Sequence, residues 1–276
     1  MRDNIAHFGG DPSRVTMWGQ SSGGLAVGLQ IVAFGGGGGP APLHQALFQS
    51  QALEPGITGN FTRDAMQAVA GFVGCNATDL QAAAAVRCLR GLPMQTLVDA
   101  VAATIHGDVA HNIGDVWLPS VDGDFLPDKP SALLRGGRFH RGITALAGWT
   151  EDDLTFFVDQ KIATAADTRA FYAAYLPGVG EASLDALLAL YPVGEFRAQG
   201  SLSAEFYRAA RIIRDILMVC EPIWLGEQTA EKGAEMFLYH WNQTMLTAPL
   251  EAEIHPPGPR RPSISLPDKG TCRGAC

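Results

Sequence analysis

The stretch VTMWGQSSGGLAVGL, from Val15 to Leu29, decides the fold that we expect for this chain of 276 residues. Its first letters are rich in β-formers and predict a short buried strand over residues 14–19. The apolar run LAVGLQIVAF, which starts at Leu25, predicts a helix. Between them, GQSSG leaves room only for a tight turn. That turn either holds a serine in a strained conformation or is a glycine-rich loop that joins two core elements.

A Gly-x-Ser-x-Gly step between a strand and a helix is the pattern of a nucleophile elbow, in which a catalytic serine stands on a sharp turn. Glycines are expected on both sides because the serine backbone is strained and a Cβ at Gly19 or Gly23 would collide with neighbouring elements. Ser21 would then project from the carboxyl edge of a sheet, and the first N–H groups of the helix would face a developing oxyanion. The pattern therefore favours a serine hydrolase.

Three later segments predict further strands of the same sheet. They are HQALFQSQ (44–51), GITALAGW (142–149) and EMFLYHWN (235–242). Helical patterns lie between residues 62 and 102 and again from 164 to about 232. Strands that alternate with helices predict an α/β fold, in which helices cover both faces of a mainly parallel sheet.

The composition excludes several classes of partner and cofactor. The formal net charge of −8 leaves no basic surface for nucleic acid or an anionic membrane. No apolar stretch approaches the roughly 20 residues of a membrane-spanning helix, and the N-terminal MRDNIAHFGGDP lacks the apolar region of a signal peptide. The run FGGGGGP (34–40) lacks the Lys-Ser/Thr of a phosphate-binding loop. Cys272 and Cys276 lack a second pair for zinc, so we expect no metal and no organic cofactor.

The cysteines and glycosylation sequons indicate the compartment. Cys75 and Cys88 bracket an Ala-rich helical segment, and they either form a local disulfide or remain two semi-buried thiols. The chain has five cysteines, so at least one is free or bonded elsewhere. Sequons begin at Asn60, Asn76 and Asn242. Together these features suggest a secreted, glycosylated ancestor, while the absence of a visible signal peptide leaves the compartment of this chain open.

The segment NIAHFGGDPSRVTMWGQSSGG (4–24) resembles the signature of the type-B carboxylesterase/lipase family, which includes fungal lipases and cholinesterases. HQALFQSQ, the cysteine pair before LRGLP, PSVDGDFLPDKP and ALAGWTEDDLTFF fit the same family, so the resemblance extends from residue 1 to about 245. It implies an α/β-hydrolase fold and hydrolysis of carboxylic esters through an acyl-serine intermediate. It also implies an ester with an apolar acyl or alcohol group, because Phe34 and the glycine run lie where the family lines its acyl pocket.

The resemblance assigns most of a catalytic site. Ser21 matches the nucleophile, and the backbone N–H of Ser22 matches one oxyanion donor. Gln20 and Ser22 replace the Glu and Ala that are commoner in the family, at similar size. The triad acid is normally the Glu of an Asp-Glu-Gly step, which is Asp-Asp-Leu here and places Asp153 at the acid position. Glu151 is the fallback, and without the family the acidic trio at 151–153 would read as a solvated strand end.

The triad histidine is the weak point of the resemblance. The family carries it in a loop after the last strand, within a Gly-x-x-His context that this chain lacks. His255 lies in the right region but is followed directly by prolines, and His240 falls within the predicted strand. The remaining histidines precede that loop: His7, His44, His106, His111 and His140. We take His255 as the candidate base.

The resemblance also implies that this chain begins inside the family's fold, without the earlier strands and the Gly-Gly loop that supplies further oxyanion donors. We therefore expect the second half of the sheet in one domain over residues 1–250, followed by a Pro-rich tail over 251–276 that buries little. The strand before Ser21 would be an edge strand with unpaired N–H and C=O groups, and through it the chain would self-associate.

Three functions compete at this point. The first is an ester hydrolase impaired by the missing oxyanion loop and histidine. The second is a non-catalytic, cholinesterase-like binding domain or an inactive gene fragment. The third is a different serine hydrolase that uses His106 or His111 as its base, which the chain order Ser, acid, His disfavours.

Overall fold

The computed structural model describes residues 1–242, with gaps at 40, 51–52, 55–56, 58–59, 77–78, 113–115 and 177, and it describes only the backbone of 108–112. The described residues form two compact units. One combines residues 1–55 with those from Gly123 onward, and the other is Gly56–Asp122. His255, Cys272 and Cys276 lie outside the described residues, as does the tail expected at 251–276.

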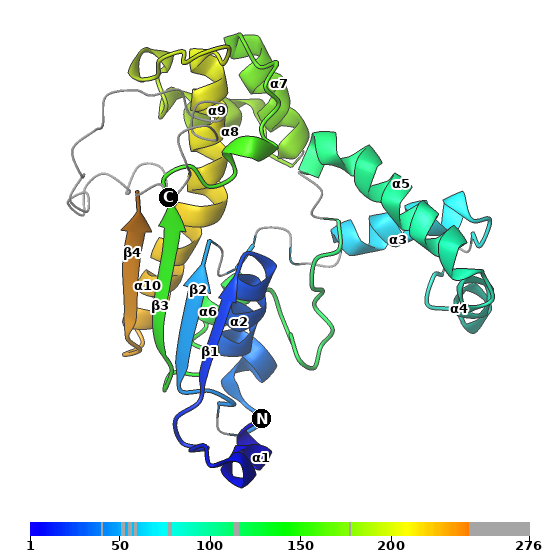
Figure 1. Cartoon of the computed structure of the whole chain (residues 1–276), viewed down its shortest axis with the longest axis vertical. Helices are drawn as coiled ribbons and strands as arrows, with labels where there is room; N and C mark the ends of the chain where they lie inside the picture. The colour runs from blue at the N-terminus through cyan, green and yellow to red at the C-terminus, as the bar shows by residue number, and fades with distance from the viewer. Residues whose placement is uncertain are drawn as a thin grey trace. The chain divides into compact units, whose positions relative to one another are not determined.

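The larger unit contains a four-stranded parallel sheet in the order β1-β2-β3-β4 (Figure 1). The strands are β1 (Thr16–Gln20), β2 (Gln45–Gln49), β3 (Thr144–Thr150) and β4 (Met236–Trp241). All four lie within the segments that the sequence predicts, so the fold class and the parallel arrangement are confirmed. Because the strands are parallel, their carboxyl ends lie at one edge of the sheet, where α/β proteins carry their ligands.

Three helices cover one face of this sheet. They are α2 (Ser22–Val32), α6 (Pro130–Arg135) and α10 (Cys220–Ala230), of which α2 contacts β1 and β2 and α10 contacts β4. Phe48 and Ala147 point toward these helices and are almost fully buried, together with Val32 and Leu225 from the helices themselves. The apolar residues of this face form the core that holds the strands in register.

The opposite face differs from the expectation that helices would cover both faces. Within the described part of the chain no helix covers it, and Trp18, Phe237 and Trp241 are 69%, 58% and 47% exposed. The prediction of a buried strand at 14–19 is therefore wrong, because no residue of β1 is buried. β1 has a partner strand on one side only, and its alternate side chains point to the uncovered face.

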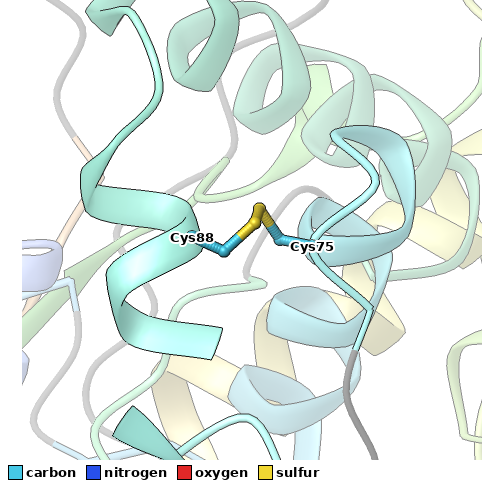
Figure 2. Close-up of a disulfide and its surroundings, with 2 residues drawn as sticks. All are labelled: Cys75 and Cys88. Carbon is cyan, nitrogen blue, oxygen red and sulfur yellow. A yellow bond between two sulfur atoms is a disulfide. The ribbon is translucent and has the colours of Figure 1, made fainter. Parts of the chain in front are cut away.

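The smaller unit contains α3 (Asn60–Phe72), α4 (Ala83–Arg90) and α5 (Met94–Asn112), of which α3 packs against α5. Cys75, just after α3, is bonded to Cys88 on α4, with their Cα atoms 5.7 Å apart (Figure 2). The alternative of a disulfide at this pair is therefore confirmed. The bond joins the two helices across a sequence separation of 13 residues.

The other helices of the larger unit precede β1 or lie between β3 and β4. They are α1 (Arg2–Ile5), α7 (Ala165–Tyr175), α8 (Glu181–Ala189) and α9 (Ala204–Arg214), and a π-turn over Asp215–Val219 joins α9 to α10. Buried Glu205 and Arg208 pair on α9, and Thr168 of α7 donates a hydrogen bond to Glu205 at 2.7 Å. A search of the described helices finds none that is long and apolar enough to cross a membrane.

Candidate active site

Ser21 lies between the end of β1 and the start of α2, with backbone angles of φ 54° and ψ −127°. Few residues other than glycine adopt a positive φ, and such strain is stored mainly at functional sites. The N–H of Ser21 donates to the carbonyl of Gln49 at 2.8 Å, which ties the turn to β2. The side chain is exposed and does not cap α2. The turn therefore presents a hydroxyl that is not used by the helix behind it.

The two flanking glycines have different roles. A Cβ on Gly19 would lie 2.1 Å from the carbonyl oxygen of Gly23, so only glycine lets the strand pass the first turn of α2. A Cβ on Gly23 would meet nothing within 4 Å. The expected collision is thus confirmed for Gly19 and wrong for Gly23, because Gly23 is the residue approached and its own Cβ position points into open space.

The first turn of α2 supplies the candidate oxyanion donors. Its first intrahelical bond is donated by the N–H of Leu25 to the carbonyl of Ser21 at 3.0 Å. The N–H groups before Leu25, which begin with that of Ser22, have no partner earlier in the helix, as at any helix start. They lie where the helix dipole is positive, next to the Ser21 hydroxyl. This arrangement can stabilise negative charge on an oxygen bound at Ser21.

Asp153 lies in a turn that directly follows β3. Its Oδ2 accepts a hydrogen bond from the N–H of Thr150 at 2.8 Å. The next residue, Leu154, is buried and has φ 67° and ψ 0°, a left-handed conformation that costs a leucine about 1–2 kcal/mol and that glycine adopts freely. The turn thus has the backbone shape expected of an Asp-Glu-Gly step, although leucine occupies the glycine position. It holds Asp153 at the carboxyl edge of the sheet, two strands from Ser21.

Glu151 anchors the end of β3 to α9. Its Oε1 lies 2.6 Å from Nη2 of Arg211 and its Oε2 lies 3.1 Å from Nη1 of Arg214, which also donates to the Glu151 carbonyl at 2.9 Å. Nε2 of His240 lies 2.9 Å from Oε2 of Glu151, without the alignment of a hydrogen bond. Two guanidinium groups therefore occupy the carboxylate that could replace Asp153.

His240 belongs to β4, as the sequence predicts, and its ring stacks on Trp149. In the sheet register it lies level with Ser21 but three strands away, which is about 14 Å at ordinary strand spacing. A general base must lie within hydrogen-bond reach of its nucleophile, so His240 is too far from Ser21.

The other histidines that precede the last strand divide between the two units. His44 and His140 come just before β2 and β3, at the amino edge, and His7 precedes β1 at the same end of the molecule (Figure 1). His106 and His111 belong to α5 of the smaller unit. Among the described histidines of the larger unit, none lies beside Ser21.

Phe34 and the glycine run lie at the wrong end of α2 for an acyl pocket beside Ser21. The helix has 11 residues and is about 16 Å long, so it carries them away from its N-terminus at Ser21 to the amino edge of the sheet. There Gly35, Gly36 and Gly39 line a cavity of about 540 Å³ with His44 and His140. The expectation that these residues line the acyl pocket is therefore wrong, because adjacency in sequence does not survive the length of a helix.

The strand–serine–helix turn, the acidic turn after β3 and the parallel order of the strands together match an α/β-hydrolase half-site. The family model described as the carboxylesterase family matches residues 1–257. The chain belongs to this family.

Relatives of this carboxylesterase-family chain cover it almost completely. A secreted lipase of Arthroderma benhamiae is 49% identical over 282 residues, covering 96% of this chain and 50% of the relative. An inactive carboxylesterase-like protein of Byssochlamys spectabilis, named VdtD, is 30% identical and covers 88% of this chain and 44% of the relative. The crystal structure of Aspergillus niger EstA matches with a TM-score of 0.69 at 19% identity, over 87% of this chain and 45% of that one. The chain thus spans about half the length of the proteins it matches.

One strained residue of this carboxylesterase-family chain has no signal in the sequence. Ser50 follows β2 with a φ of 54°, is 8% exposed, and donates its N–H to the carbonyl of Gly148 at 2.8 Å. The sequence QSQ around it lacks the flanking glycines that single out Ser21. The positive φ could be found only from the structure, where the end of β2 turns against β3.

Proposed function

We propose that this chain carries the nucleophile and acid of a carboxylic ester hydrolase that acts through an acyl-serine intermediate. In this proposal the hydroxyl of Ser21 attacks the ester carbonyl, and the N–H of Ser22 donates to the oxyanion. Asp153 orients the imidazole of His255, which takes the serine proton and returns it to the leaving alcohol. The mechanism needs no metal or organic cofactor.

The strained backbone of Ser21 is the observation that carries this proposal. A φ of 54° at a serine, between a strand and a helix start, is the conformation that lifts a hydroxyl clear of the sheet. The matched glycine contact at Gly19 supports the same function, because it brings the N–H groups of α2 close to the hydroxyl. Asp153 is preferred to Glu151 as the acid because the Glu151 carboxylate is already paired with two arginines.

The same proposal includes an impaired reaction. The described residues place no histidine beside Ser21, and His255 must come from the segment after β4. Loss of one oxyanion donor lowers kcat about 10²–10³-fold, and a triad acts as a unit, so loss of its base leaves only residual catalysis. We expect ester turnover by this chain alone to be far below that of a complete enzyme of the family.

The substrate that we propose is a small ester with an apolar acyl or alcohol group. The support is the family itself and a relative named as a lipase. That relative is also named as secreted, and the Cys75–Cys88 disulfide suits an oxidising compartment. We therefore propose a secreted ancestor, with glycan at the exposed Asn60 as the sequon to test first.

A fluorophosphonate probe tests the nucleophile directly, because it reacts covalently with an activated serine. We expect labelling of the soluble chain that is lost in Ser21→Ala. The matched control is Ser50→Ala, which removes another serine of positive φ after a neighbouring strand and should keep the label. Labelling that survives Ser21→Ala, or that is lost equally in Ser50→Ala, would refute the assignment.

A non-catalytic binding domain is the second candidate, and the similarity to a protein named as inactive favours it. The two functions differ in one measurement. If the folded, soluble chain takes up no probe at millimolar concentration and long exposure, Ser21 is not activated and the binding function is the better proposal. Mutation of His106 and His111 together tests the third candidate, since it predicts that labelling depends on them.

We also propose that the isolated chain self-associates through β1. Within the described residues β1 pairs only with β2, so one row of its N–H and C=O groups has no strand partner. Such an edge is a template for a strand from another chain. A monodisperse monomer with one sharp, cooperative unfolding transition would contradict this expectation.

A further inference from the structure

The uncovered face of the sheet is an apolar platform built from alternate residues of all four strands. In register, Trp18 lies beside Leu47, Leu146 and Phe237, and one step further along Gln20 lies beside Gln49, Gly148 and Tyr239. We call this set the open face, and it also contains Thr16, Gln45, Thr144, Thr150 and Trp241. Parallel sheets are found almost only with both faces covered, so an open face of this kind lacks an occupant.

The open face carries no charged side chain. Its members are aromatic, aliphatic, Thr, Gln or Gly, although charged residues make up 17% of the chain. Its polar groups are largely paired with one another: Nε1 of Trp18 donates to Oε1 of Gln49 at 2.7 Å, and Nε2 of Gln49 donates to the hydroxyl of Tyr239 at 3.0 Å. A solvated face would normally carry charges, so these residues fit contact with an apolar surface better than contact with water.

The exposed area is large enough to bind a polypeptide. Trp18, Phe237 and Trp241 together expose on the order of 400 Å². That is about half of what one partner buries in a stable interface, before the half-buried Leu47 and Leu146 are counted. Contiguous apolar patches of this size mark interaction sites.

The open face is continuous with the free edge of β1, and this continuity defines the shape of the occupant. An occupant that fits both must supply a strand to hydrogen-bond with β1 and apolar helices to lie across Trp18 and Phe237. A second copy of the chain could pair at the edge, but the described helices of each copy already lie on the opposite face of its own sheet. A segment with unused helical faces fits better.

We infer that the open face and the β1 edge together bind the part of a carboxylesterase fold that this chain does not match in its relatives. This chain covers 96% of its own length but only 50% of the secreted lipase, and 45% of the EstA chain. The unmatched half of each relative belongs to the same family of folds and must pack somewhere, and a parallel sheet with one bare face and one bare edge is the surface available. The inference holds whether that segment is joined to this chain or supplied separately.

Fragment complementation tests this inference by binding, independently of any ester turnover. The full chain, carrying Ser21→Ala to exclude catalytic effects, is refolded with the unmatched half of the Arthroderma benhamiae lipase, and the products are sized by light scattering. We expect the self-associated chain to convert to a one-to-one complex. Tryptophan emission should shift to shorter wavelength as Trp18 and Trp241 leave water.

Two matched variants locate the interface. Phe237→Thr removes an exposed phenylalanine of the open face, and Phe156→Thr removes one that is 79% exposed and lies elsewhere in the larger unit, just after β3. Phe237→Thr should weaken binding at least tenfold, while Phe156→Thr should leave it within about twofold of the parent.

Each contrary outcome overturns the inference. No one-to-one complex would mean that the segment does not occupy this face, and equal weakening by both variants would mean that binding is non-specific. A homodimer that resists the added segment and is broken by Phe237→Thr would assign the face to a second copy. Because the readout is binding by a chain without the Ser21 hydroxyl, failure of the ester hydrolase proposal would not alter any of these results.

Discussion

Substitution of the glycine before the nucleophile turn separates a packing requirement from a sequence pattern. Gly19 and Gly23 occupy equivalent places in the Gly-x-Ser-x-Gly step, yet only Gly19 has backbone atoms in the way of a Cβ. Gly19→Ala would place that carbon 2.1 Å from the carbonyl oxygen and 2.2 Å from the carbonyl carbon of Gly23. Both are backbone atoms, so relief requires β1 and α2 to separate rather than a side chain to rotate.

The expected effects have opposite signs. Overpacking costs about 1–3 kcal/mol, and the upper end applies to Gly19→Ala because the contact is backbone on backbone. Gly23→Ala fills open space on a helix and should stabilise by about 0.4–1 kcal/mol through the unfolded chain. The two variants should therefore differ by at least about 2 kcal/mol, or roughly 30-fold in the ratio of folded to unfolded chain.

Urea unfolding followed by tryptophan emission provides the assay, since Trp18, Trp149 and Trp241 all belong to the sheet. The midpoint should fall for Gly19→Ala and rise slightly for Gly23→Ala, with unchanged slopes. Fluorophosphonate labelling should decline only in Gly19→Ala, where the helix N-terminus moves away from the hydroxyl. Equal midpoints, or a larger loss in Gly23→Ala, would refute the close approach of β1 to α2.

Three further predictions concern other parts of the structure. Replacing Cys75 and Cys88 by serine should lower the free energy of unfolding of the smaller unit by about 3 kcal/mol, as measured by hydrogen exchange of its amides. Glu205→Ala should cost about 3–5 kcal/mol in urea unfolding because it leaves a buried arginine unpaired, whereas Thr168→Val should cost about 1 kcal/mol. Burial holds the pKa of His140 below 6.5, so the unfolded chain takes up a proton that the folded chain resists; stability should fall as the pH drops below about 6.5, and His140→Phe should remove that dependence in pH-resolved unfolding curves.

The sequence predicts the elements of this fold better than their surroundings. Apolar runs locate β2, β3 and β4, and the glycines locate the turn at Ser21, because these signals are local. The burial of β1 is predicted wrongly since its residues are those of a central strand, and the number of neighbours around a strand is not written in its own letters. Sequence patterns thus describe what a segment can bury, while the rest of the chain decides whether it does.

Site residues fail for a related reason. Phe34 looks close to Ser21 along the chain, but the helix between them moves it to the other edge of the sheet. Glu151 looks interchangeable with Asp153, yet Arg211 and Arg214 come from more than 50 residues away to occupy it. Such pairings depend on long-range packing, which has no period or motif that a single sequence can reveal.

The position of the acid restricts where a base for Ser21 can come from. Asp153 follows β3 and Ser21 follows β1, so an imidazole that contacts both must bridge two strand spacings, about 10 Å, across the carboxyl edge. The chain leaves β4 on the far side of β3, and any later histidine must return over β3 toward β1. His255 is 13 residues beyond Asn242, which allows a reach of up to about 43 Å, so distance does not exclude it. Its following proline instead restricts the backbone of His255 to extended conformations, so the return path must deliver the imidazole from an extended segment rather than from a helix.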